Sequence, residues 1–141
     1  MARTRRSTAA LIATMLSIVG ALAVISPASA GNAYIGVDGR ESRCNNNSRS
    51  CLYYSTLSSA YWATTGGDSD LGNNYFASGT GSGAGQRVRN NAARMSCYYG
   101  VAQQCQSYFS PGYTGSMDWM FWGQTGQLYY TWNDEASMKV I

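Results

Sequence analysis

The chain of 141 residues contains no histidine, and this absence excludes several kinds of enzyme. No Ser–His or Cys–His pair can form, so nucleophilic catalysis of that type is ruled out. The carboxylates are Asp38, Glu41, Asp68, Asp70, Asp118, Asp134 and Glu135. Most of them stand beside Gly, Ser or Asn, and we expect solvated turn acids rather than an acid–base pair. The chain is therefore predicted not to be an enzyme and to require no catalytic cofactor.

Positive charge is scarce beyond the first few residues. The formal net charge is +3, but Arg3, Arg5 and Arg6 account for this excess. Residues 31–141 keep seven of the ten Lys and Arg residues, which balance all seven Asp and Glu residues. Nucleic-acid binding needs a basic patch in the folded domain, so no nucleic-acid partner is predicted.

Long apolar runs are also missing after residue 30. The run from Leu11 to Ile25 follows the basic start and is shorter than the ~20 residues of a spanning helix. The segment then ends in the small-residue pattern Ala28-Ser29-Ala30. These are the three parts of a secretory signal, so cleavage after Ala30 is predicted. The mature protein, residues 31–141, is predicted to be a single secreted domain with no membrane partner.

The mature segment is rich in Tyr, Trp, Gly, Ser and Asn, which favours an all-β fold. Its four cysteines predict two disulfides in an exported protein. Four cysteines allow three connectivities. We favour Cys44–Cys51 and Cys97–Cys105, because each pair closes a short polar loop. A metal site is the alternative, but export and the lack of histidine argue against it.

Short apolar runs separated by turn-forming residues predict the strands. The runs cover residues 52–54, 61–64, 94–99, 107–109, 117–122 and 128–132. Turns or loops are predicted at residues 66–67, 72–74, 79–85, 111–112 and 123–126, with a short helical turn near 70–75.

The mature segment contains an internal repeat. In each half a Cys precedes an aromatic pair, and an Asn-containing segment follows, at Asn90-Asn91 and at Asn133-Asp134. From Tyr53 to Asn90 is 37 positions and from Tyr108 to Asn133 is 25, so the first half has about twelve extra residues. The Gly-rich stretch from Gly66 to Gly85 holds them, and we expect it to be mobile. Two similar β units predict a sandwich of two Greek keys.

Tyr108, Tyr113 and Gly115 have the spacing of a strand that folds over into a hairpin, with two packed rings and a glycine at positive φ. This spacing resembles the folded-hairpin signature of the βγ-crystallin fold. The first half departs from it, since Tyr53 is followed by Ser58 and Ala60 at the matching places.

The βγ-crystallin resemblance implies a calcium site near the end of each key. Its ligand pattern, Asn/Asp-Asn/Asp-x-x-Ser/Thr-Ser, is matched by Asn133, Asp134 and Ser137 in the second half and by Asn90 and Asn91 in the first. Arg94 stands where the first half should supply a hydroxyl ligand, and its charge disfavours a cation. The alternative is that these Asn and Asp residues cap turns through side-chain hydrogen bonds.

The order of these segments after a signal peptide resembles peptidase inhibitor family thirty-six, a group of secreted actinobacterial proteins with a γ-crystallin-like fold. The resemblance implies inhibition of an extracellular proteinase, most plausibly a metalloproteinase. It places the protease-facing bond at Cys97–Tyr98, with Tyr98 entering an apolar pocket of the enzyme. The loop would include Tyr99 and Gly100 and would be stapled at Cys105.

An extracellular crystallin-like module that binds calcium or cell-wall glycan is the alternative function. Four Trp and eleven Tyr residues could supply rings that stack on sugars. The same rings could equally belong to the core or lie half-covered along the strands.

Overall fold

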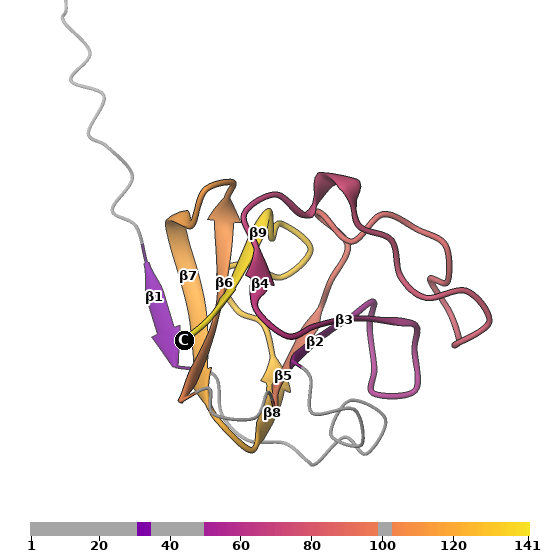
Figure 1. Cartoon of the computed structure of the whole chain (residues 1–141), viewed down its shortest axis with the longest axis horizontal. Coiled ribbons are helices and arrows are strands. Elements are labelled where there is room, and N and C mark those ends of the chain that lie inside the picture. Colours follow the sequence, from indigo (N-terminus) through magenta and orange to yellow (C-terminus); the bar gives the residue numbers. More distant parts are fainter. Residues whose placement is uncertain (1–30, 35–49, 99–102) are drawn as a thin grey trace, which may run out of the picture.

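The computed structural model describes residues 31–34, 50–98 and 103–141 (Figure 1). The predicted signal segment lies outside these residues, as do Cys44, Tyr99 and Gly100. The strands are β1 (Asn32–Tyr34), β2 (Ser50–Tyr53), β3 (Tyr61–Thr64), β4 (Gly67–Asp68), β5 (Arg94–Cys97), β6 (Gln104–Ser110), β7 (Thr114–Phe121), β8 (Gln124–Gln127) and β9 (Ser137–Val140). A 3-10 turn, η1 (Leu71–Asn73), follows β4 and confirms the predicted helical turn.

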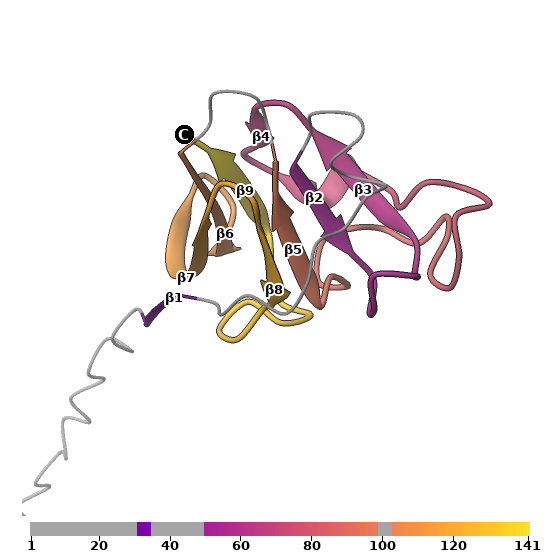
Figure 2. The ribbon, with the colours of Figure 1, turned by 90° about the horizontal axis from the view of Figure 1, so that it is seen from below.

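Two sheets face each other across the molecule (Figure 2). One sheet has the strand order β1-β7-β6-β9-β4 and the other β3-β2-β5-β8. The first key comprises β2 to β5 and the second β6 to β9. Each key gives one strand to the sheet of the other, since β4 joins β9 and β8 joins β5. The predicted all-β sandwich of two Greek keys is therefore confirmed.

The core lies between the sheets and draws on both keys. Leu52 and Met95 come from one sheet, and Met120 and Met138 from the other; all four are fully buried. Phe76 adds a ring from the long segment between η1 and β5. Burial of each such side chain stabilises the fold by about 1.5–3 kcal/mol. In the described part of the chain, no helix is both long and apolar enough to span a membrane.

One predicted strand was wrong. Residues 128–132 form a loop, and the last strand of that sheet is β8, which lies largely where a turn was predicted. The cause is Asp118 of β7, whose carboxylate accepts hydrogen bonds from the backbone N–H groups of Tyr129, Tyr130 and Thr131 at 2.8–3.1 Å. These groups point at a side chain and do not join a strand ladder.

Three further strands, besides β8, were not predicted, and each of them has four residues or fewer. β1, β4 and β9 have three, two and four residues. β1 begins two residues after the predicted cleavage site and pairs in parallel with β7 at the sheet edge. Gly31 anchors it, because its N–H donates to Ser116 Oγ at 3.1 Å and its carbonyl accepts from Met117 N at 2.8 Å.

The second key contains the predicted folded hairpin. The rings of Tyr108 and Tyr113 lie 5.9 Å apart between centroids, and Gly115 has a φ of +84°. Ser137 holds the hairpin closed, since its hydroxyl donates to Ser110 O at 2.7 Å and accepts from Tyr113 N at 3.0 Å. This geometry confirms that the aromatic and Gly spacing marks a strand that folds back.

The first key reaches a similar shape by another route. The Gly-rich segment packs on the hairpin, with Ser82 O accepting from Ala60 N at 2.9 Å. Gly83 lies under the ring of Tyr54, where a Cβ would come within 2.2 Å of the ring. The extra residues, which we expected to form a mobile loop, therefore pack against the hairpin of the first key, where the second ring and the glycine of the signature are missing.

Candidate functional site

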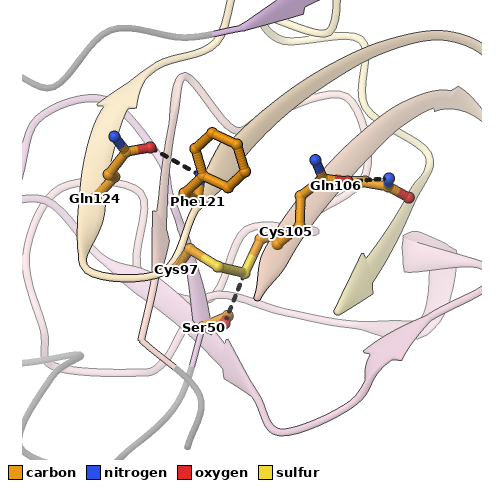
Figure 3. The surroundings of a disulfide bond; sticks show 7 residues. Ser50, Cys97, Cys105, Gln106, Phe121 and Gln124 are labelled. Carbon is orange, nitrogen blue, oxygen red and sulfur yellow. Dashed lines mark hydrogen bonds between the residues drawn. A yellow bond between two sulfur atoms is a disulfide. The ribbon is translucent and has the colours of Figure 1, made fainter. Parts of the chain in front are cut away.

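The Cys97–Cys105 disulfide is present, as predicted (Figure 3). Cys97 ends β5 in one sheet and Cys105 lies in β6 of the other, with their Cα atoms 5.6 Å apart. The hydroxyl of Ser50, the first residue of β2, is hydrogen-bonded to Cys105 Sγ at 3.0 Å. The staple therefore joins the two sheets at the base of the loop that connects the keys.

Hydrogen bonds from two sides hold the stem of this loop. The carbonyl of Ile141 accepts from Gln103 N at 2.7 Å and from Gln104 N at 2.8 Å. On the other side, Gly123 N donates to Cys97 O at 2.7 Å and Trp122 N to Gln103 O at 3.2 Å. The C-terminus and the β7–β8 turn thus fix both ends of the loop.

The structure contradicts the role predicted for Tyr98. Its side chain is only 4% exposed and packs with Cys51 and Tyr53. Thr125 Oγ1 donates a hydrogen bond to its hydroxyl at 3.3 Å. A ring buried in this way belongs to the core of the protein and is not presented to a protease pocket. Tyr99 and Gly100, the other predicted contact residues, lie outside the described residues.

Aromatic side chains are nevertheless exposed beside the stem. Phe121, the last residue of β7, and Trp122, in the β7–β8 turn, are 50% and 55% exposed. Phe121 stands edge-on to Trp119 with 5.2 Å between ring centroids. Its backbone N–H donates to Gln124 Oε1 at 2.8 Å, a bond drawn in Figure 3 near the Cys97 end of the disulfide. The turn is therefore held in shape while its rings face outward.

The second predicted disulfide is only partly within the described residues. Cys51 is fully buried and is not a free thiol. Cys44, its predicted partner, lies outside the described residues. The pairing Cys44–Cys51 therefore remains a prediction.

The two Asn-containing segments meet, and they are linked reciprocally. Asn90 and Asn133 both adopt left-handed backbone conformations, with φ of 63° and 56°. Asn90 N donates to Glu135 O at 2.9 Å, and Asn133 N donates to Ala92 O at 2.8 Å. Each key thus closes the end of the other, which agrees with a turn-forming role for both Asn residues.

The predicted calcium ligands are not all brought together. Asn90, Asn91 and Asn133 line one pocket, whereas Asp134 is exposed and does not line it. Ser137 is fully buried and its hydroxyl is committed to the folded hairpin, so its predicted ligand role is wrong. Among the described residues, no three His, Cys, Asp or Glu side chains are grouped as a metal site. Calcium binding itself remains a prediction.

Two of the acids expected in solvated turns are fully buried. Asp118 anchors the 128–132 loop, and Glu135 Oε1 accepts from Asn91 N at 3.1 Å and from Ala92 N at 2.9 Å. Glu135 Oε2 has no hydrogen-bond partner among the described residues. Burial raises the pKa of Glu135 to about 8, against the opposing effect of the backbone hydrogen bonds. Both carboxylates accept hydrogen bonds from backbone N–H groups of loops.

The pocket between the two Asn segments has a volume of about 470 Å³. Its described lining comprises Tyr54, Ser55, Thr56, Asn90, Asn91, Ala93, Arg94, Gln127, Trp132 and Asn133. Arg94 and Gln127 lie opposite each other on β5 and β8, and Tyr53, just before Tyr54, pairs with Arg94 on the other side. The pocket therefore sits at the end of the β2-β5-β8 strands, with Arg94 on the middle one.

Comparison with known proteins supports the fold. A structure from work on the evolution of the eye lens βγ-crystallin domain fold matches with a TM-score of 0.50 and 14% identity, over 75% of this chain and 90% of that chain. The N-terminal domain of Protein S matches with a TM-score of 0.47 and 13% identity, over 66% of this chain and 94% of that chain. No protein-family model and no curated protein matches the sequence. The chain thus has a βγ-crystallin-like fold, as predicted.

Proposed function

We propose that the protein is a secreted, non-enzymatic inhibitor of metalloproteinases, as the resemblance to peptidase inhibitor family thirty-six implies. The observation that supports this proposal is the Cys97–Cys105 staple, whose loop is held at both ends by the hydrogen bonds of Gln103, Gln104 and Gly123. A loop restrained in this way loses little conformational entropy on binding a protease cleft. Inhibition would then need no covalent chemistry.

Because Tyr98 is buried, the apolar contact with a protease must come from elsewhere. Trp122 is the strongest candidate among the described residues, since it is exposed and its backbone bonds to Gln103 in the loop stem. Exposed Trp residues next to a rigid segment are frequent energetic centres of protein interfaces. In this proposal the β7–β8 turn and the stapled loop contact the enzyme together.

The experiment that tests the function is a proteinase panel. Purified residues 31–141 are titrated against a thermolysin-type metalloproteinase, a subtilisin-type proteinase and a trypsin-type proteinase. Stoichiometric loss of activity in the metalloproteinase assay is expected. Full activity of all three enzymes at micromolar concentrations of the protein would refute the inhibitor proposal and leave only the fold.

Replacing Cys97 and Cys105 together with serine is expected to lower the free energy of unfolding by about 2–3 kcal/mol, because a loop of this length is released in the unfolded chain. Inhibition should weaken by more than about tenfold, since the loop loses its restraint. Urea unfolding and inhibition are measured on the same preparation. Unchanged inhibition in a folded double variant would separate the stapled loop from the function.

Trp122→Ala is expected to weaken inhibition by about tenfold or more and to change stability by less than about 1 kcal/mol, because the side chain is exposed. Trp132→Ala is the matched control, since Trp132 is 52% exposed in a different loop. Inhibition constants are compared after the fold is checked by circular dichroism. Equal inhibition by both variants and the parent would exclude Trp122 from the contact surface.

A further inference from the structure

We propose that the pocket at the ends of β2, β5 and β8 binds a neutral oligosaccharide made of glucose-type pyranose rings. Its volume of about 470 Å³ is within the range of small-ligand sites. Arg94 begins β5 and Cys97 ends it, so the pocket and the disulfide staple lie at opposite ends of this strand. The saccharide site therefore does not depend on the inhibitor proposal.

Three side-chain amides in the pocket have no hydrogen-bond partner in the described part of the chain. They belong to Asn90, Gln127 and Asn133, which are all exposed. Asn90 and Asn133 are held by the reciprocal backbone bonds between the keys, and Gln127 is held by the pairing of β8 with β5. Each amide combines N–H donors with an acceptor oxygen, and each sugar hydroxyl is both donor and acceptor. The three amides thus suit a ligand with several hydroxyl groups.

Trp132 supplies an apolar surface for a sugar ring. Its side chain is 52% exposed, although the backbone on both sides of it is anchored. Thr131 N donates to Asp118 Oδ2 at 2.8 Å, and Asn133 N donates to Ala92 O at 2.8 Å. An aromatic side chain on a fixed backbone loses little conformational entropy on binding. A glucose-type ring, whose substituents are equatorial, has a flat C–H face that can stack on the indole.

The charge of the pocket favours a neutral ligand. No described carboxylate lines it, and Arg94, the charged residue of its described lining, is already engaged in an interaction of its own. A cation would therefore meet no described carboxylate, and an anion would have to compete for Arg94. Peptides are commonly bound as an added strand along a sheet edge, whereas this pocket lies at strand ends. A neutral sugar is the ligand class that these features fit best.

The test is an NMR titration of isotope-labelled residues 31–141 with cellotriose, the β-1,4-linked trimer of glucose. Sorbitol, an open-chain polyol with no ring face, is titrated in parallel at the same hydroxyl concentration. Cellotriose is expected to shift the indole N–H signal of Trp132 and the side-chain amide signals of Asn90, Gln127 and Asn133, with a Kd of about 1 mM or below. Sorbitol should leave these signals in place.

These measurements need no variant. No shift of the four signals at about 10 mM cellotriose, or equal shifts with sorbitol, would overturn the proposal. Raising the salt concentration to about 0.5 M should leave the affinity for cellotriose unchanged, because the ligand carries no charge.

Variants then locate the site. Trp132→Ala should weaken cellotriose binding by about tenfold, and Trp132→Phe should retain part of the affinity. Tyr129→Ala is the matched control, since Tyr129 is 72% exposed in the same loop but does not line the pocket. Gln127→Ala should weaken binding by about fivefold, whereas Trp122→Ala should have no effect. A folded Trp132→Ala variant with the affinity of the parent would refute the assignment, whatever the proteinase panel shows.

Discussion

Replacing Asp118 with alanine is expected to lower the free energy of unfolding by about 3–5 kcal/mol, the largest effect of any single substitution considered. Its carboxylate is fully buried and accepts four hydrogen bonds, from the N–H groups of Tyr129, Tyr130 and Thr131 and from Thr131 Oγ1, at 2.8–3.1 Å. Alanine would leave a fully buried N–H of Thr131 and its neighbours without their acceptor. The loop would then lose its shape.

Urea unfolding of the purified variant measures this loss. Asp134→Ala is the matched control, because Asp134 is exposed in the same β8–β9 segment and should change stability by less than about 0.5 kcal/mol. Asp118→Asn keeps one acceptor oxygen, so its loss of stability should lie between those of Asp118→Ala and Asp134→Ala. A stability loss below about 1 kcal/mol in Asp118→Ala would mean that water replaces the carboxylate and that the loop does not depend on it.

The second large effect is a pH dependence caused by Glu135. Burial raises its pKa in the folded state to about 8 from an ordinary 4.5. Between these values the unfolded chain has lost the Glu135 proton while the folded chain retains it. The contribution of protonated Glu135 to the free energy of unfolding is therefore complete below about pH 4.5. It is lost as the pH rises towards 8, by about 1.4 kcal/mol per pH unit. We expect a loss of about 3 kcal/mol between pH 5 and pH 7.5.

Glu135→Gln tests this assignment. The amide oxygen can still accept from Asn91 N and Ala92 N, but the side chain no longer titrates. The variant should match the parent near pH 5 and exceed its stability at pH 7.5, with little slope between. The absence of histidine leaves this window free of imidazole titration. A slope that persists in Glu135→Gln, or that disappears in Asp134→Asn, would assign the titration to another group.

The sequence predicted the fold well where a pattern has a local cause. Tyr108, Tyr113 and Gly115 mark a bend that three residues can specify, and the prediction was correct. Strand 128–132 failed because its aromatic residues suit a strand, whereas its backbone is captured by Asp118 on another strand. A signal was available, since Asp118 shares the inward face of β7 with the buried Met120 two positions on. An acid at such a position predicts a buried anchor.

The candidate site was harder to predict because it is assembled from both keys. The Asn segments were identified as a pair, but their shared pocket depends on the reciprocal bonds of Asn90 and Asn133. Arg94 was noted as an obstacle to calcium, and its place beside Gln127 follows only from the pairing of β5 with β8. The resemblance to the inhibitor family implied that Tyr98 faces a protease, whereas packing against Tyr53 turns its ring into the core.

The exchange of β4 and β8 between the keys has a kinetic consequence. β4 pairs with β9 across 72 positions of sequence, from Gly67 to Lys139, and β8 completes the sheet begun by β2. Contacts between such distant segments are slow to form. Neither key can unfold alone without breaking the pairing of β4 with β9 or of β8 with β5. A proteinase that attacks the sandwich would then have to wait for a global opening, so the lifetime of the protein beside its proposed target is set by an unfolding rate.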